Sequence, residues 1–123
     1  MPTGTLEHVN ISVSDPDRMA DLLGRLAGWW RRWEGPSLMG GRTIHCGDDN
    51  AYVALYHHPD ISGPFEKGLP LQHVALVVDD LDAAEQVVSE AGLEAINHGN
   101  YDPGRRFYFF DWDGIEWEIV SYA

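Results

Sequence analysis

Two stretches of the chain share one pattern: residues 6–15 read LEHVNISVSD and residues 71–80 read LQHVALVVDD. At a spacing of 65 residues the leucine, the histidine, two valines and an aspartate coincide, so that His8 matches His73. A repeat of this kind indicates two copies of one structural unit. In each stretch large apolar residues alternate with a more mixed set, which predicts a strand with one face on a core.

An amphipathic helix is predicted after each of these strands. Asp15 followed by Pro16 is typical of a helix N-terminus, and the aspartates at 79–80 offer the same cap. Gly28 and Gly92 are candidates for the left-handed residue that ends each helix. The apolar residues in between are spaced by three and four, which gives each helix one buried stripe. They are Met19, Leu22, Leu23 and Leu26, then Leu81, Ala84, Val87, Val88 and Ala91.

Three short strands are predicted after each helix, and together with the repeat they define the fold class. The predicted strands are residues 29–33, 42–46 and 51–57, then 93–97, 105–111 and 115–121. Asp, Asn and Gly residues form a tight turn before the last strand of each half. Residues 59–70 are rich in Pro and Gly and are predicted to be a linker. We expect a single α+β domain over residues 1–123, with βαβββ modules at about 1–60 and 70–123 forming a curved mixed sheet around a cup.

The composition excludes several kinds of partner. Hydrophobic residues make up 44% and charged residues 23% of the chain, as in ordinary globular proteins. The net charge of -12 leaves no basic surface for nucleic acid or an anionic membrane. The single Cys46 excludes an intrachain disulfide and suits a reducing compartment. No apolar run approaches membrane-spanning length. We therefore expect a cytoplasmic protein that binds a small molecule.

Three side chains are candidates for a shared site. His8 and His73 lie on the strand face opposite the large core aliphatics. Glu118 alternates with Trp117 and Ile119 along the last predicted strand, so its carboxylate is also turned away from the core. An unpaired carboxylate in such a place would be costly. If the two modules pair their sheets, all three side chains line one concave surface.

The pattern resembles the vicinal-oxygen-chelate superfamily, also called the glyoxalase/bleomycin-resistance/dioxygenase proteins. Its mark is the paired βαβββ module, and its usual closing motif is D-P-D-G-x-x-x-E. Residues 111–118 read DWDGIEWE, with Trp112 in place of the proline. The resemblance covers essentially the whole chain, and its motifs are specific for the superfamily rather than for one activity.

The resemblance implies a metal site on the first and last strands of the modules. His8, His73 and Glu118 fill three of its four ligand positions, and Ala54 stands at the fourth. Two imidazoles and a carboxylate leave coordination positions open for substrate, water or dioxygen. This donor set favours Fe(II) or Mn(II) and is compatible with Zn(II) or Ni(II). Ala54 counts against a glyoxalase, whereas extradiol dioxygenases and fosfomycin-type thiol transferases use three ligands.

The resemblance also implies catalytic candidates. Tyr108 lies ten residues before Glu118, where the extradiol dioxygenases carry a tyrosine. Arg106 shares the predicted face of Tyr108 and could balance charge. His98 lies one residue from the place of the family's upstream histidine, while residues 50–52 lack the histidine that the family uses as acid or base in module one.

These features predict a metal-dependent enzyme that acts on a small oxygen-chelating substrate, and an extradiol-type dioxygenase is the sharpest version. One alternative is a metal-dependent thiol transferase, lyase or epimerase of the same superfamily. Another is a non-catalytic drug- or metabolite-binding protein of the bleomycin-resistance kind. A homodimer is expected, and either one chain or a swapped dimer could complete the metal site. His45 is expected on the strand face opposite the cup, and residues 29–33 (WWRRW) in the sheet core or a dimer surface.

Overall fold

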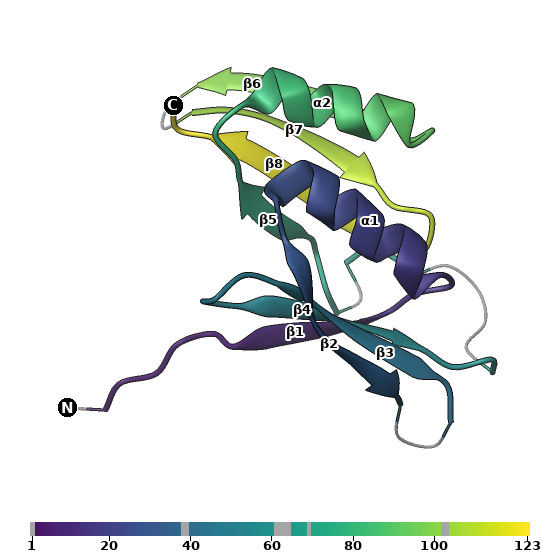
Figure 1. The fold of residues 1–123 in the computed structure, drawn as a ribbon. Coiled ribbons are helices and arrows are strands. Elements are labelled where there is room, and N and C mark those ends of the chain that lie inside the picture. The colour runs from purple at the N-terminus through teal and green to yellow at the C-terminus, as the bar shows by residue number, and fades with distance from the viewer. Residues whose placement is uncertain (1, 38–39, 61–64, 69, 102–103) are drawn as a thin grey trace. The chain divides into compact units, whose positions relative to one another are not determined.

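The computed structural model describes residues 2–37, 40–60, 65–68, 70–101 and 104–123. The chain divides into two compact units, which are described separately: unit 1 is residues 1–24 and 28–61, and unit 2 is residues 25–27 and 62–123. Each half has the predicted order of one strand, one helix and three strands (Figure 1). The α+β class is thus confirmed, with two four-stranded mixed sheets. Of the predicted linker 59–70, residues 61–64 and 69 lie outside the described residues.

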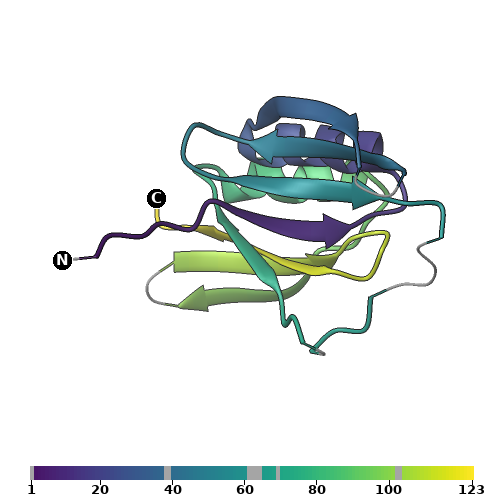
Figure 2. The same ribbon diagram turned by 90° about the horizontal axis from the view of Figure 1, so that it is seen from below.

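Unit 1 is a four-stranded sheet with a helix on one face. The strands follow the order β1-β4-β3-β2, in which β1 and β4 are parallel and the other pairs are antiparallel. They are β1 (His8–Ser12), β2 (Trp30–Pro36), β3 (Arg42–Gly47) and β4 (Tyr52–His57). Helix α1 (Pro16–Ala27) lies behind β2 and β3 in Figure 2. Its residues Met19 and Leu23 are buried with Ile44 and Leu55 of the sheet, so the open face of the sheet carries the other side chains.

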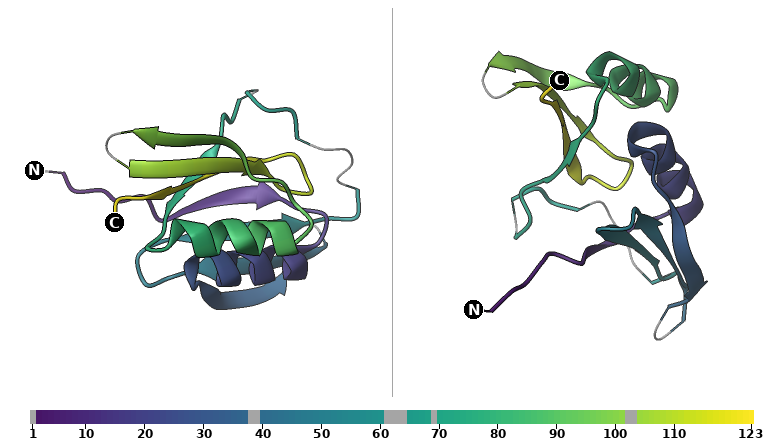
Figure 3. Two further views of the ribbon diagram at one scale, coloured as in Figure 1. Left: turned by 90° about the horizontal axis from the view of Figure 1, so that it is seen from above. Right: turned by 60° about the vertical axis from the view of Figure 1, so that its left-hand side comes forward.

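Unit 2 repeats this architecture. Its strand order is β5-β8-β7-β6, again with a parallel first pair. The elements are β5 (Val74–Val77), α2 (Leu81–Glu90), β6 (Ile96–Tyr101), β7 (Gly104–Phe110) and β8 (Glu116–Ser121). Helix α2 packs on β7 and β8, on one side of the twisted sheet (Figure 3). Phe107, Phe109, Trp117 and Ile119 are fully buried, which leaves the alternate residues of both strands on the open face.

The predicted helix ends are confirmed. Asp15 accepts a hydrogen bond from the Arg18 backbone N–H at 3.1 Å, and Asp80 caps α2 in the same way through Ala83 at 3.0 Å. Gly28 has φ of 70°, in the left-handed region that glycine adopts most readily. No helix in the described parts of the chain is long and apolar enough to cross a membrane.

Two strands differ from their predicted ranges because each contains an irregularity. The strand predicted at 29–33 extends to Pro36, and its pairing with β3 shifts register between Arg31 and Trp33. The strand predicted at 93–97 runs instead from Ile96 to Tyr101. Asn97 has φ of 53°, and the register of β6 shifts between Ile96 and Gly99. Such bulges re-aim side chains and cannot be read from alternation alone.

The turn before β8 is organised by a buried carboxylate. Asp111 accepts hydrogen bonds from the backbone N–H groups of Asp113 and Ile115 at 2.9 and 3.0 Å, and from the indole N–H of Trp117 at 2.9 Å. Burial raises the pKa of Asp111, although these three donors act in the opposite direction. The corresponding Asp48 of unit 1 also accepts two backbone N–H groups, but it is half-buried, and these bonds lower its pKa.

Asp111→Asn is expected to destabilise the protein by about 1–3 kcal/mol, because an amide cannot accept from all three donors and leaves a buried N–H unsatisfied. Urea unfolding of the variant and the wild type measures the difference. Asp48→Asn is the matched control, since Asp48 also accepts two backbone N–H groups but is less buried and has no indole partner. Equal stability losses in the two variants would show that the indole contact does not matter.

Candidate metal centre

The two units pair their first and last strands in the same register. In unit 1 Asn10 is opposite Ala54, and in unit 2 Ala75 is opposite Glu118. Asn10 and Ala75 are themselves related by the repeat spacing of 65 residues. Ala54 therefore occupies in unit 1 the position that Glu118 occupies in unit 2, as the alignment of the two halves predicted.

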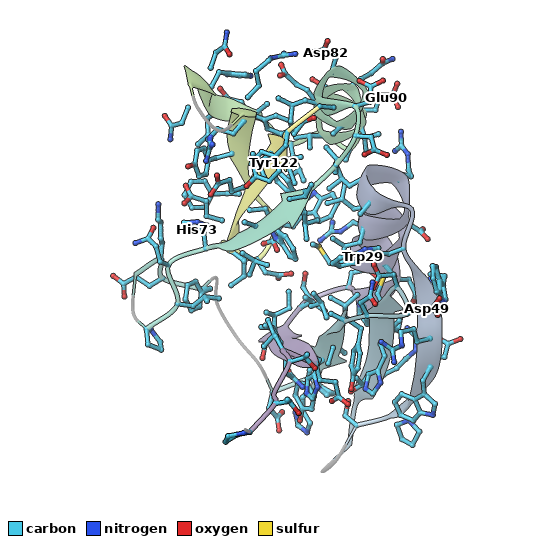
Figure 4. All side chains as sticks on the ribbon, turned by 90° about the vertical axis from the view of Figure 1, so that its left-hand side faces the viewer. Trp29, Asp49, His73, Asp82, Glu90 and Tyr122 are labelled. Atoms are coloured by element: carbon cyan, nitrogen blue, oxygen red, sulfur yellow. The ribbon has the colours of Figure 1, made fainter. Side chains whose placement is uncertain are left out.

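His73 and Glu118 meet on the open face of the unit 2 sheet. His73 immediately precedes β5, and Asp82 and Glu90 on α2 lie away from it (Figure 4). Its Nε2 atom is 3.1 Å from Oε1 of Glu118. Only 10% of the Glu118 side chain is exposed, against 32% for His73. Of these two candidate ligands, Glu118 is thus nearly buried, whereas His73 reaches solvent.

Arg106 and Tyr108 complete this group within unit 2. Nη1 of Arg106 donates to Oε2 of Glu118 at 2.9 Å, and Nη2 donates to the Gly104 carbonyl at 3.3 Å. Tyr108 is paired with Glu118 across the strands, and its ring meets that of His73 edge-on with centroids 6.0 Å apart. Arg106 therefore supplies the counter-charge for one oxygen of Glu118, while the other oxygen faces His73.

The chemistry of this pair fits a divalent metal ion. Imidazole nitrogen and carboxylate oxygen bind such ions at about 2.0–2.2 Å, so two neighbouring ligands at a right angle lie about 3 Å apart. The separation of His73 Nε2 and Glu118 Oε1 is 3.1 Å. Since Arg106 occupies the second oxygen, Glu118 presents a single oxygen on the side of His73.

His8 lies in unit 1 with its ring held on two sides. Its Nδ1 atom is 2.7 Å from Oε1 of Glu7, and its ring stacks on Tyr52 with centroids 4.8 Å apart. An ionised carboxylate can only accept, so in the neutral tautomer that donates to Glu7 the proton is on Nδ1 and the lone pair is on Nε2. The hydrogen bond from His8 lowers the pKa of Glu7. This is the arrangement in which metal-binding histidines are commonly held.

A row of rings continues across the open face of unit 1. Tyr52 stacks between His8 and His45, at 4.8 and 4.5 Å, and His45 meets Trp33 at 4.8 Å. The prediction for His45 is therefore wrong, since its ring lies on the same face as His8. His45 stands between the buried residues Ile44 and Cys46, and this alternation was the signal that could have placed it. Tyr52 and Glu7 were missed because no motif marks them.

The structure does not bring His98 together with His73 and Glu118. Its Nε2 atom is 2.8 Å from Oε1 of Glu85 on α2, and its ring approaches that of the buried Phe107 with centroids 6.0 Å apart. These contacts place His98 on the helix side of the sheet. The irregular pairing of β6 beside Asn97 accounts for this direction.

Neither unit, within its described residues, gathers three His, Cys, Asp or Glu side chains into a metal-binding group. Unit 2 contributes the pair His73 and Glu118, and unit 1 contains His8. The structure thus brings together two of the three predicted ligands, His73 and Glu118, and the three-ligand set stays a prediction.

Comparison with known proteins identifies the family. Residues 5–119 match the model of the Glyoxalase/Bleomycin resistance protein/Dioxygenase superfamily. The chain belongs to this superfamily, as the resemblance predicted. Comparison with curated protein sequences found no significant match.

Solved structures share the fold at low sequence identity. A glyoxylase/bleomycin resistance protein/dioxygenase domain from Frankia sp. EAN1pec is 21% identical, with a TM-score of 0.82 over 98% of both chains. The fosfomycin resistance protein FosX from Mesorhizobium loti is 22% identical, with a TM-score of 0.73 over 100% of this chain and 94% of that one. FosX from Listeria monocytogenes, complexed with Mn(II) and sulfate, is 15% identical, with a TM-score of 0.74 over 100% and 95%.

A second buried acid stands beside the site on β8. Glu116 is 4% exposed, and its Oε1 atom is 2.6 Å from Nζ of Lys67, the only lysine in the chain. The Lys67 ammonium also lies 5.9 Å from the ring centroid of Phe110. The pair thus holds the segment around Lys67 against the open face of the sheet.

Lys67→Met is expected to destabilise the protein by about 1–3 kcal/mol because it leaves the Glu116 carboxylate without its cation. The loss stays in this range because Lys67 is partly exposed and water can replace some of the interaction. Thermal and urea unfolding measure it. Adding Glu116→Gln to Lys67→Met should recover part of the loss, whereas purely additive effects would show that the two side chains are not coupled.

Proposed function

We propose that this protein is a divalent-metal-dependent enzyme that acts on a small substrate through two neighbouring oxygen atoms. His8, His73 and Glu118 would hold the ion, with His8 supplied by the same chain or by the partner in a homodimer. The observation that carries the proposal is the 3.1 Å approach of His73 Nε2 to Glu118 Oε1. Fe(II) or Mn(II) suits this donor set best, and a bound ion would act as a Lewis acid toward the substrate oxygens.

The roles of the protein side chains follow from their contacts. Glu7 keeps the proton of His8 on Nδ1, so that Nε2 is available as a ligand. Arg106 holds Oε2 of Glu118 at 2.9 Å and thereby limits the carboxylate to one ligand oxygen. Tyr108, beside His73, is placed to donate its phenolic hydrogen to an oxygen of a bound substrate.

The sharpest version of the proposal is an extradiol-type dioxygenase. The substrate would be a catechol, and both atoms of dioxygen would enter the ring-opened product, so no external reductant is needed. The tyrosine ten residues before the ligand glutamate supports this reaction. The pairing of His98 with Glu85 weighs against a role of His98 as its acid or base.

The second candidate is addition of a thiol or water to an activated carbon. It is supported by the likeness to fosfomycin resistance proteins, one of which is complexed with Mn(II). A lyase, an epimerase or a non-catalytic drug-binding protein of the bleomycin-resistance kind would use the same cup. These alternatives would give other results in the metal-binding and turnover experiments below.

Loss of a proposed ligand should abolish metal binding. We expect Glu118→Ala and His73→Ala to weaken binding of Mn(II) at least 100-fold, because a three-ligand site has no spare donor. Isothermal titration of chelator-treated protein measures the affinity. His98→Ala is the matched control, since it removes a histidine from the other face of the same sheet. Tight binding by Glu118→Ala would remove Glu118 from the site.

Reaction class can be tested on the protein loaded anaerobically with Fe(II). Catechol is expected to bind and, after oxygen is admitted, to give a yellow ring-opened product. Tyr108→Phe should lower kcat more than it raises KM, because its hydrogen bond strengthens as charge develops on the substrate oxygen. Turnover of an epoxide by the Mn(II) protein, without any reaction of catechol, would favour the addition reaction instead.

A further inference from the structure

Strand β2 is an edge strand of the unit 1 sheet, and nearly all of its side chains reach solvent. The strand order β1-β4-β3-β2 ends at β2, and every residue of the strand except Gly35 is exposed. Of the two places expected for residues 29–33, this exposure excludes the sheet core for residues 30–33. An edge of this kind can pair with another strand through its backbone N–H and C=O groups.

This edge carries large apolar side chains, whereas edge strands are usually polar. Trp30 and Trp33 are each 48% exposed. The edge strand of unit 2, β6, has the usual composition, since its exposed residues in the described part of the strand are Asn97, His98 and Asn100. Large apolar groups gathered on a surface are typical of an interface. The difference between the two equivalent edges therefore indicates a partner for β2.

The irregularity in β2 brings both tryptophans to one face of the strand. Trp30 is opposite Gly47 of β3. Trp33 is opposite His45, which lies two residues before Gly47 and so on the same face. Residues three apart in a regular strand would face opposite sides, but the extra residue Arg32 changes the alternation. The bulge thus gathers the two rings instead of separating them.

The other face of β2, toward the helix, carries opposite charges on the two sides of the bulge. Nη1 of Arg31 is 2.8 Å from Oδ1 of Asp17 on α1. Oε2 of Glu34 is 2.9 Å from Nη2 of Arg42 on β3. Arg31 and Glu34 also approach each other at 3.3 Å, so they share this face. The edge therefore presents one cation and one anion in a fixed order.

This order of charges suits a second copy of the same strand in one register. Two identical antiparallel strands related by a twofold axis place one position opposite its own copy. Centring the pair on Arg31 or on Glu34 would place like charges opposite each other, which is destabilising. Centring it on the bulge, which counts as one ladder position, places Arg31 opposite Glu34 of the second copy, and the symmetry makes this contact twice. Arg32 is turned back to its own sheet, where it donates to the Asp48 carbonyl at 3.0 Å.

The same register also matches the aromatic rings. It places Trp30 opposite Gly35 of the second copy. A Cβ atom at Gly35 would lie 2.6 Å from Cζ2 of Trp33, so the Trp33 ring lies over this glycine. Trp30 of one copy would therefore meet the Trp33 ring of the other, and aromatic pairs stabilise an interface beyond the area they bury. Charge and ring placement thus fit one occupant, a second copy of this chain.

We propose that β2 is a self-association edge, at which two copies of the chain pair their β2 strands antiparallel with the bulges at the twofold axis. The pairing joins two four-stranded unit 1 sheets edge to edge. It goes beyond the proposed function, because no proposed metal ligand and no residue of unit 2 takes part. One strand pair and four rings form a small interface, so the association is reversible.

Charge reversal across the interface tests the pairing. Sedimentation equilibrium of the full chain after chelator treatment measures association, and circular dichroism checks folding. The wild type should dimerise reversibly, and Arg31→Glu and Glu34→Arg should each weaken association at least tenfold because each places like charges opposite each other. An equimolar mixture of the two variants should associate at least tenfold more tightly than either alone. Both variants lose the contact between Arg31 and Glu34 within one chain, so the mixture isolates the contact between copies.

Asp17→Asn is the matched control, since it removes the α1 partner of Arg31 without changing the charges that face the second copy. Its association should equal that of the wild type. Hydrogen exchange gives a measure that needs no variant: the amides of residues 30–36 should gain protection as protein concentration rises, and those of residues 96–101 should not.

A wild type that stays monomeric at every concentration would overturn the proposal. So would association that both charge variants leave unchanged, or a mixture that associates no more tightly than its components. Mn(II) affinity should be the same in these variants and the wild type, so the metal site and the self-association edge fail separately.

Discussion

The pairing of the first strand with the last strand in each unit determines what both open faces can hold. Strand β1 pairs with β4, and β5 pairs with β8 in the same register. The pairs Asn10–Ala54 and Ala75–Glu118 are therefore equivalent. Side chains alternate along a strand, so a slip of one residue would exchange the buried and open sets. The buried set, including Leu55 and Ile119, prevents that slip. The core therefore fixes where the polar side chains of the site lie.

Carboxylates on the open face of unit 2 impose a second constraint, which the few basic residues satisfy. Glu116 and Glu118 are both nearly buried on one strand, and each has its own cation, Lys67 and Arg106. A buried charge without such a partner is strongly destabilising. The chain has only 8 Lys and Arg against 20 acids, and two of these few cations lie beside the two acids of β8.

The repeat, the helix caps and the closing motif were predictable because each depends on local chemistry or on one alternating pattern. Glu118 and Ala54 were aligned correctly for the same reason. The direction of His98 was not, because the bulge in β6 changes side-chain parity within the strand. The contacts of Glu118 with Arg106 and of His8 with Tyr52 depend on strand pairing, which a strand's own sequence does not specify.

The two units share one strand topology and differ in the side chains on their open faces. At equivalent positions unit 2 has Glu118 and Tyr108 where unit 1 has Ala54 and His45. Glu118 attracts cations and requires Arg106, so the open face of unit 2 is polar and charged. Ala54 neither attracts a cation nor requires one, and the open face of unit 1 carries the row of rings from His8 to Trp33 instead.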